Sequence, residues 1–125
     1  MSGKLVHFEI PFDDGARARA FYADTFGWQL MEMPEMDYTM VMTGPSDPET
    51  GPTEPGFING GMFQRTEPFK GPNIVIDVAD IDETLKTVEK AGGKILQERQ
   101  PVGEMGFAAY FNDSEGNVIG LWQTA

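Results

Sequence analysis

The chain has 125 residues, a formal net charge of −11, 40% hydrophobic residues and no cysteine. This length suits one compact domain with its own core, and the lack of cysteine excludes disulfides and thiolate chemistry. The acidic excess disfavours nucleic acid and anionic membranes as partners, and no stretch approaches the roughly 18 to 20 apolar residues of a membrane span, so we expect a cytoplasmic protein.

The first half of the chain predicts a strand, a helix and three further strands. LVHFEIPF (residues 5–12) alternates with the period of two that is typical of a half-buried strand. A helix follows in residues 13–28, where Asp13 or Asp14 can cap the start and Gly27 can end it in a left-handed conformation. We expect its packing face to consist of Ala18, Phe21, Tyr22 and Thr25. The three strands are expected at residues 28–33, 37–44 and 56–65.

The segment TGPSDPETGPTEPG (residues 43–56) is rich in proline, glycine and acidic residues, which predicts a loop. It is either a plain connector or a mobile flap over a binding site, because long loops in compact domains often act as lids. The sequence leaves both interpretations open.

The second half repeats this order of elements at an offset of 66 positions. A strand at residues 73–80 precedes a helix at 80–93, which Asp80 and Glu83 can start in the manner of a capping box. Three strands are then expected at residues 93–101, 106–113 and 117–123. At this offset Asp14 falls on Asp80, Gly27 on Gly93 and Leu30 on Leu96. We therefore predict a single domain, residues 1–125, made of two βαβββ modules at about residues 3–65 and 70–124.

Neither module can bury a sheet face well by itself. Pairing the modules would join their strands into a curved, mostly antiparallel sheet, with the helices on the outer faces. The predicted class is α+β, and the concave inner face is the expected place for a small-molecule ligand.

Two motifs carry a resemblance to a known family. HFEIPFDDGARARAFYADTFGW and DSEGNVIGLWQ resemble the first-half and last-strand signatures of the vicinal oxygen chelate superfamily, which includes glyoxalase I, bleomycin-resistance proteins and extradiol dioxygenases. The resemblance covers almost the whole chain and is narrowest to small glyoxalase-related proteins that share HFEI, FYADTFGW and GNVIGLW. It implies the paired-module fold, a lyase, isomerase or dioxygenase-like enzyme or a non-enzymatic binder, and a homodimer. The fold alone does not choose among these functions.

The same resemblance bears on a metal site. Metal-binding members resemble one another in four inward-facing ligands on the first and last strands of each half. His7 matches the first of these positions, whereas Asn73, Gly120 and either Gly60 or Gly61 stand at the others. Because a stable open site usually takes about three protein ligands, we expect no resident metal, with a divalent ion held in part by His7 as the alternative.

His7 and Glu9 share one strand face and are the candidate catalytic residues, since an imidazole and a carboxylate within reach can transfer protons. Methionine suits an apolar ligand because it is flexible and polarisable. The candidate ligand-binding residues are Asn73, Asp77, Met40, Met42, Met62 and Trp122. Plainer interpretations stay open: a hydrogen-bonded histidine in a polar cavity, and methionines that pack a core or a subunit interface.

We therefore expect a glyoxalase-like protein that acts on or binds a small apolar or carbonyl compound, with a degenerate or absent metal site. The first alternative is a protein that sequesters a hydrophobic compound without a reaction, as the bleomycin-resistance relatives do. The second is an interaction module that has no small ligand.

Overall fold

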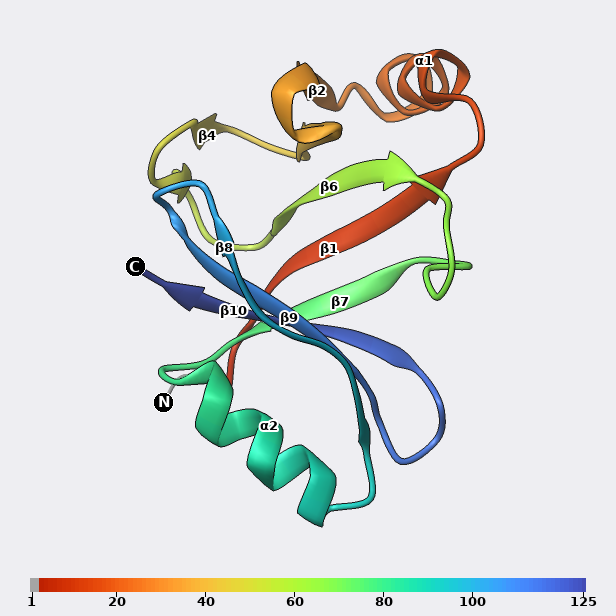
Figure 1. The fold of residues 1–125 in the computed structure, drawn as a ribbon. Helices are drawn as coiled ribbons and strands as arrows, with labels where there is room; N and C mark the ends of the chain where they lie inside the picture. Colours follow the sequence, from red (N-terminus) through yellow and green to blue (C-terminus); the bar gives the residue numbers. More distant parts are fainter. Residues whose placement is uncertain (1–2) are drawn as a thin grey trace. The chain divides into compact units, whose positions relative to one another are not determined.

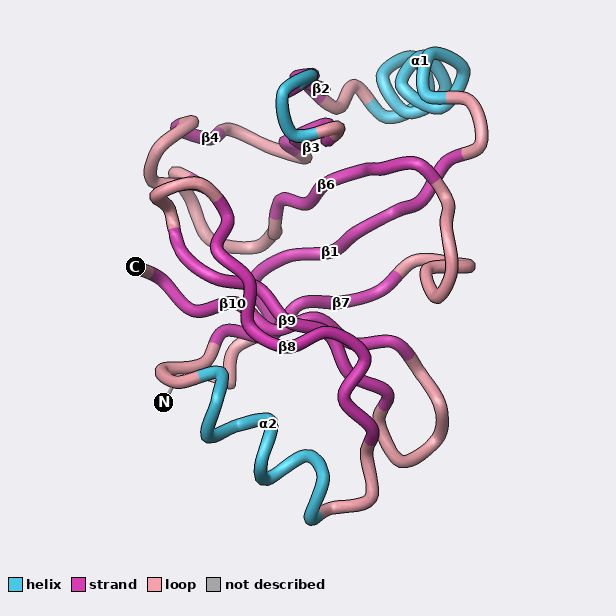
Figure 2. Tube along the Cα trace, in the orientation of Figure 1, coloured by secondary structure: helices cyan, strands magenta, loops and turns pink. Residues whose placement is uncertain are grey.

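The structure, a computed structural model, describes residues 3–125 (Figures 1 and 2). It divides into two compact units: residues 7–72 form one, and residues 3–6 together with 73–125 form the other. Within the described residues each unit contains one α-helix and a layer of hydrogen-bonded strands. The division after residue 72 lies just beyond the predicted gap between the modules at residues 65–70.

The unit of residues 7–72 contains the helix α1, its strands and most of β1, which begins two residues before the unit. Its elements are β1 (Leu5–Phe12), α1 (Gly15–Phe26), β2 (Gln29–Met33), the 3-10 helix η1 (Pro34–Met36), β3 (Tyr38–Met42), β4 (Ser46–Asp47), β5 (Gly51–Pro52) and β6 (Asn59–Gln64). The strand order is β2-β3-β6-β1, in which β1 and β6 are parallel and the other neighbours are antiparallel.

The other unit repeats this arrangement. Its elements are β7 (Asn73–Asp77), α2 (Ile81–Lys90), β8 (Lys94–Val102), β9 (Gly106–Asn112) and β10 (Val118–Thr124). The strand order is β8-β9-β10-β7. As in the first unit, the first and last strands (β7 and β10) are parallel, and the other described pairs are antiparallel. The α+β class, the two βαβββ modules and the mostly antiparallel pairing are therefore confirmed.

Helix α2 packs on its sheet through an apolar stripe. Ile81 and Leu85 are buried against Val78, Ala109 and Leu121, and further apolar side chains surround this cluster. The helix begins where Asp80 Oδ1 accepts the backbone N–H of Glu83 at 3.1 Å, so the predicted cap is confirmed. Burial of each such aliphatic side chain contributes about 1.5–3 kcal/mol to stability.

Helix α1 has the predicted ends, but its predicted packing face is only partly covered. Asp14 Oδ1 accepts the N–H of Arg17 at 3.0 Å, and Gly27 ends the helix with φ of 73°. However, no residue of α1 is buried, and Phe21 is 57% exposed. The expected packing face is therefore confirmed only in part: Ala18, Phe21 and Tyr22 face β1, but none of them is buried, and Thr25 is exposed. The aromatic rings near the end of the helix contact one another and Trp28, with Tyr22 stacked on Trp28 at 4.9 Å between ring centroids.

The predicted loop at residues 43–56 contains the short hairpin of β4 and β5. Asn59 on β6 holds the start of this segment: its Oδ1 accepts the N–H of Thr43 at 3.0 Å, and its Nδ2 donates to the Ser46 hydroxyl at 2.8 Å. The segment is thus tied to the sheet at its beginning, while a role as a flap stays a prediction. Neither α1 nor α2, the α-helices of the described chain, has the length and apolar character needed to cross a membrane.

Candidate functional site

Strand pairing places the candidate polar residues of β1 on one face of their sheet. Glu9 on β1 pairs with Gly61 on β6, and Gly61 pairs with Met40 on β3. Paired residues in neighbouring strands point to the same side, and side chains alternate along each strand. His7, Glu9, Tyr38 and Met40 therefore share one face of the sheet.

A hydrogen-bonded chain connects these polar side chains. The Tyr38 hydroxyl donates to Glu9 Oε2 at 3.1 Å and lies 2.8 Å from His7 Nε2. Because the hydroxyl has one proton and donates it to Glu9, its oxygen accepts from His7 when Nε2 carries a proton. In the neutral imidazole the lone pair is then on Nδ1. The arrangement joins a base to a carboxylate through one hydroxyl group.

Burial lowers the pKa of His7 in this hydrogen-bonded chain. Glu9 is only 5% exposed and His7 is half-buried. Desolvation lowers the pKa of His7 below its usual 6.5, and the nearby Glu9 carboxylate opposes this shift only in part. His7 is therefore neutral near pH 7, the state in which an imidazole can accept a proton.

A glycine makes room for the tyrosine in this chain. A Cβ atom on Gly61 would lie 1.7 Å from the Tyr38 hydroxyl oxygen and 1.9 Å from its Cζ, so a side chain there must displace Tyr38. A Cβ atom on Gly60 would meet Phe8 on the opposite face. Of the two glycines considered for the ligand position, Gly61 is the one on the face of His7.

Tyr38 is the site residue that sequence reasoning did not select. Its alternation with Met40 and Met42 in YTMVM indicated the shared face of those three side chains. The contact with His7 and Glu9 spans 31 and 29 residues of chain, respectively. Only the strand order β3-β6-β1 brings these residues together.

The donor atoms do not fit the four-ligand metal centre that the resemblance implies. Of its four positions, His7 is the one with an imidazole, whereas Gly61 and Gly120 have no side chain and Asn73 offers an amide. His7 Nε2 is bonded to Tyr38, whose ring occupies the space at Gly61. Residues 3–125 contain no group of three or more His, Cys, Asp or Glu side chains placed to hold a metal ion.

The remaining polar candidates lie in the other unit. Trp122 on β10 pairs with Asp77 on β7, and Gly120 pairs with Val75, so Asn73, Asp77 and Trp122 share one face of their sheet. Asn73 is 5% exposed, and Trp122 Nε1 donates to the Thr124 hydroxyl at 3.3 Å. Binding of a ligand by these three residues stays a prediction.

The candidate methionines lie on two different faces. Met40 and Met42 share the face of His7 and Glu9, whereas Met62 pairs with Ile10 and is fully buried on the face toward α1. Met62 is thus separated from the candidate catalytic pair by the thickness of the sheet.

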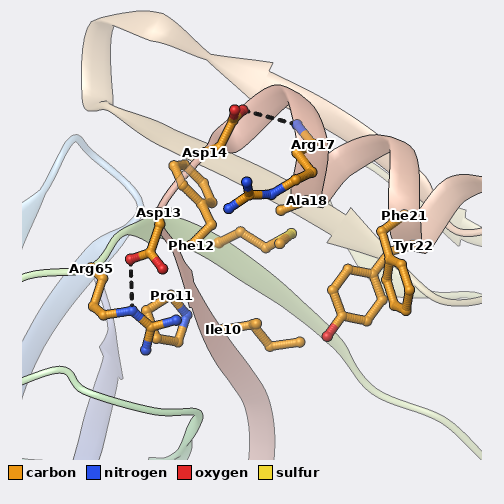
Figure 3. Close-up of a pocket in the computed structure, with 11 residues that line it drawn as sticks. Ile10, Pro11, Phe12, Asp13, Asp14, Arg17, Ala18, Phe21, Tyr22 and Arg65 are labelled. Atoms are coloured by element: carbon orange, nitrogen blue, oxygen red, sulfur yellow. Dashed lines mark hydrogen bonds and ion pairs between the residues drawn. The ribbon is translucent and has the colours of Figure 1, made fainter.

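Met62 lines a pocket on that second face, between β1 and α1 (Figure 3). This helix-side pocket has a volume of about 290 Å³. Its apolar lining consists of Ile10, Pro11, Phe12 and Met62 from the strands, and Ala18, Phe21 and Tyr22 from α1.

Comparison with known proteins gives three kinds of match. Residues 4–44 match the family model described as Bleomycin resistance protein-like N-terminal. A glyoxylase-like domain-containing protein of Didymella fabae is 34% identical over 123 residues, which cover 94% of this chain and 91% of the relative. A probable lactoylglutathione lyase of Vibrio cholerae is 28% identical over 124 residues, covering 96% and 90% of the two chains.

The fold also matches a solved structure. A glyoxalase/bleomycin resistance protein/dioxygenase superfamily member from Vibrio splendidus is similar with a TM-score of 0.64 over 98% of each chain. Its sequence identity to this chain is 15%, so this likeness concerns the fold alone.

Proposed function

Because this chain belongs to the glyoxalase/bleomycin resistance/dioxygenase superfamily, we propose that it acts on a small carbonyl compound by proton transfer. The observation that carries this proposal is the hydrogen-bonded chain of half-buried His7, half-buried Tyr38 and buried Glu9 on one sheet face. The relative named as a probable lyase supports a reaction in addition to binding.

The chemistry follows from the state of each group. Neutral His7 takes a proton from the carbon next to a carbonyl, and its ring becomes positively charged. The Glu9 carboxylate stabilises that charge, and Tyr38 holds the ring through its bond to Nε2. Met40 and Met42, on the same face, supply apolar contacts for the body of the substrate.

This proposal assigns no step to a metal ion, because the side chains at three of the four implied ligand positions do not suit one. Calorimetric titration with Zn²⁺, Ni²⁺, Mn²⁺ and Fe²⁺ tests this assignment. Binding at micromolar affinity that is lost in His7→Gln would contradict it.

The reaction can be tested without knowing the natural substrate. Chelator-treated protein in D₂O is incubated with hydroxyacetone, dihydroxyacetone and phenylacetaldehyde, and exchange of the α-hydrogens is followed by NMR. A compound that exchanges should lose about 10²–10⁴-fold of its rate in His7→Gln, since a positioned base contributes that much. Glu9→Gln and Tyr38→Phe should lower the rate by smaller factors.

Two variants are matched controls for this experiment. Tyr22→Phe removes a hydroxyl from α1, and Glu32→Gln neutralises an exposed carboxylate that pairs with Arg19 at 3.1 Å. Both should exchange hydrogen at the rate of the unaltered protein. Exchange that persists in His7→Gln and Glu9→Gln alike would rule out the proposed roles.

Sequestration without a reaction is the second candidate function. The match of residues 4–44 to a bleomycin resistance model and the two methionines on the same sheet face as His7 favour it. Tight binding of an apolar carbonyl compound, with the compound recovered intact and undeuterated, would decide for this function. The expected homodimer is a separate proposal, which light scattering at micromolar concentration tests.

A further inference from the structure

The helix-side pocket is independent of the proposed reaction, because it lies on the face opposite His7 and Glu9. Its volume of about 290 Å³ is close to the lower end of the range for small-molecule sites, about 300–1,000 Å³. Within the described chain no residue of α1 is buried, so the helix does not fill the space above Ile10 and Met62.

The floor and wall of the pocket are apolar and partly open. Met62 is fully buried beneath it, while Phe21 on the wall is 57% exposed. Tyr22 is part of that wall, and its ring stacks on Trp28 at 4.9 Å between centroids with an interplanar angle of 5°. A flat apolar group placed here would cover surface that α1 leaves exposed.

The rim of the pocket has two arginines in different situations. Arg65 Nε pairs with Asp13 at 2.9 Å, and its guanidinium also donates to the Lys70 carbonyl. The guanidinium of Arg17, by contrast, has no hydrogen bond or ion pair to any of residues 3–125. The neighbouring Asp14 carboxylate accepts the backbone N–H of Arg17. Figure 3 shows this guanidinium beside the Phe12 ring, at the pocket.

A second donor faces the same space. In Figure 3 the hydroxyl end of the Tyr22 ring points toward Ile10 on the pocket floor. This hydroxyl, too, makes no hydrogen bond to the described residues. The pocket thus combines an apolar lining with a guanidinium and a hydroxyl that can both donate hydrogen bonds.

We propose that the helix-side pocket binds a small molecule with an aromatic or aliphatic body and one carboxylate, which pairs with Arg17. Guanidinium matches a carboxylate through two parallel N–H···O bonds. A phosphate is disfavoured, because a dianion would meet the carboxylates of Asp13 and Asp14 at the rim and a net charge of −11.

The test uses 3-phenylpropanoate and its neutral counterpart 3-phenylpropan-1-ol as probes. Each is titrated into ¹⁵N-labelled full-length protein, and the shifted amides are located by NMR. Shifts at Ala18, Phe21 and Tyr22 are expected, with binding of the acid about tenfold tighter than that of the alcohol, because one charge-assisted pair is worth about that factor.

Two variants test the roles of Arg17 and of the pocket space, and a third serves as a control. Arg17→Gln should weaken the acid about tenfold and leave the alcohol unchanged. Ala18→Trp should fill the pocket and abolish binding of both probes, with thermal unfolding used to confirm that it folds. Arg99→Gln, which removes an exposed arginine near Asp82, should bind the acid as the unaltered protein does.

Other outcomes overturn the proposal. These are equal binding of acid and alcohol, an unchanged affinity in Arg17→Gln, and shifts that concentrate on His7 and Glu9. Lack of any shift at probe concentrations of about 10 mM, well beyond the range of a useful site, overturns it as well.

Discussion

The two units of this protein share one order of strands but use their helices differently. Both pair the first strand in parallel with the last, and both begin their helix with an aspartate cap. Helix α2 buries Ile81 and Leu85 in an apolar core, whereas α1 buries no residue and leaves a pocket against its sheet. The comparison shows that topology and caps do not fix packing, which depends on whether aliphatic residues recur along one helix face.

The two units also differ on the strand faces that are turned away from their helices, where each has a glycine in its last strand. Gly61 on β6 accommodates the Tyr38 hydroxyl, which then bonds to His7 and Glu9. Gly120 on β10 lies against a methyl group of Val75 and the ring of Tyr110 instead. A glycine in the corresponding strand thus makes room for a polar chain in one unit and for apolar packing in the other.

The largest expected effect is a loss of stability that is much greater for a substitution in α2 than for one in α1. Leu85→Ala should lower the free energy of unfolding by about 2–5 kcal/mol, because it leaves a cavity in the core under α2. Phe21→Ala in α1 should change it by no more than about 0.5 kcal/mol, since that ring is mostly exposed. Urea denaturation measures both. Equal losses in the two variants would show that α1 is packed as tightly as α2.

The next largest expected effect is a difference in stability between alanine substitutions at Gly61 and at Gly120. Gly61→Ala should cost about 1–3 kcal/mol, because the new methyl group must displace Tyr38. Gly120→Ala should cost less, since its Cβ would lie 3.0 Å from Val75 and 3.1 Å from the Tyr110 ring, contacts that small shifts can relieve. The same denaturation experiment gives both values. A larger loss at Gly120 would contradict the account of Tyr38.

The smallest expected effect is the pH dependence of the unit that contains His7. Burial lowers the His7 pKa in the folded protein, so the unfolded chain binds the proton more readily. This contribution to stability is fully present above the unfolded pKa of about 6.5 and is lost as the pH falls toward the lower folded pKa. His7 is the single histidine of the chain, so its ring signals in an NMR titration report that pKa directly.

Stability measured between pH 7.5 and pH 5.5, a window set by the usual histidine pKa of about 6.5, provides the comparison with a variant. In His7→Gln the loss of stability toward the acid end should be smaller than in the unaltered protein. A titration midpoint above 6.5 would mean that the Glu9 carboxylate outweighs desolvation and would reverse the sign.

Much of the fold followed from local patterns in the sequence. Alternation in LVHFEIPF predicted a strand and placed His7 with Glu9 on one face. The repeat at 66 positions predicted the two modules. The packing face of α1 was not predictable in this way, because aromatic residues at helical spacing can contact one another as readily as a sheet.

What the sequence determined by itself were the two helices, the longer strands and an aspartate cap for each helix, at Asp13 or Asp14 and at Asp80, since each depends on residues within a few positions of one another. The choice of Asp14 over Asp13 and the short hairpin of β4 and β5 came from the structure. Only the tertiary structure decided that Tyr38 reaches His7 and Glu9 over Gly61, and that Met62 lies on the other face. Those outcomes depend on which strands become neighbours, and contacts over about thirty residues of chain leave no mark in a local period.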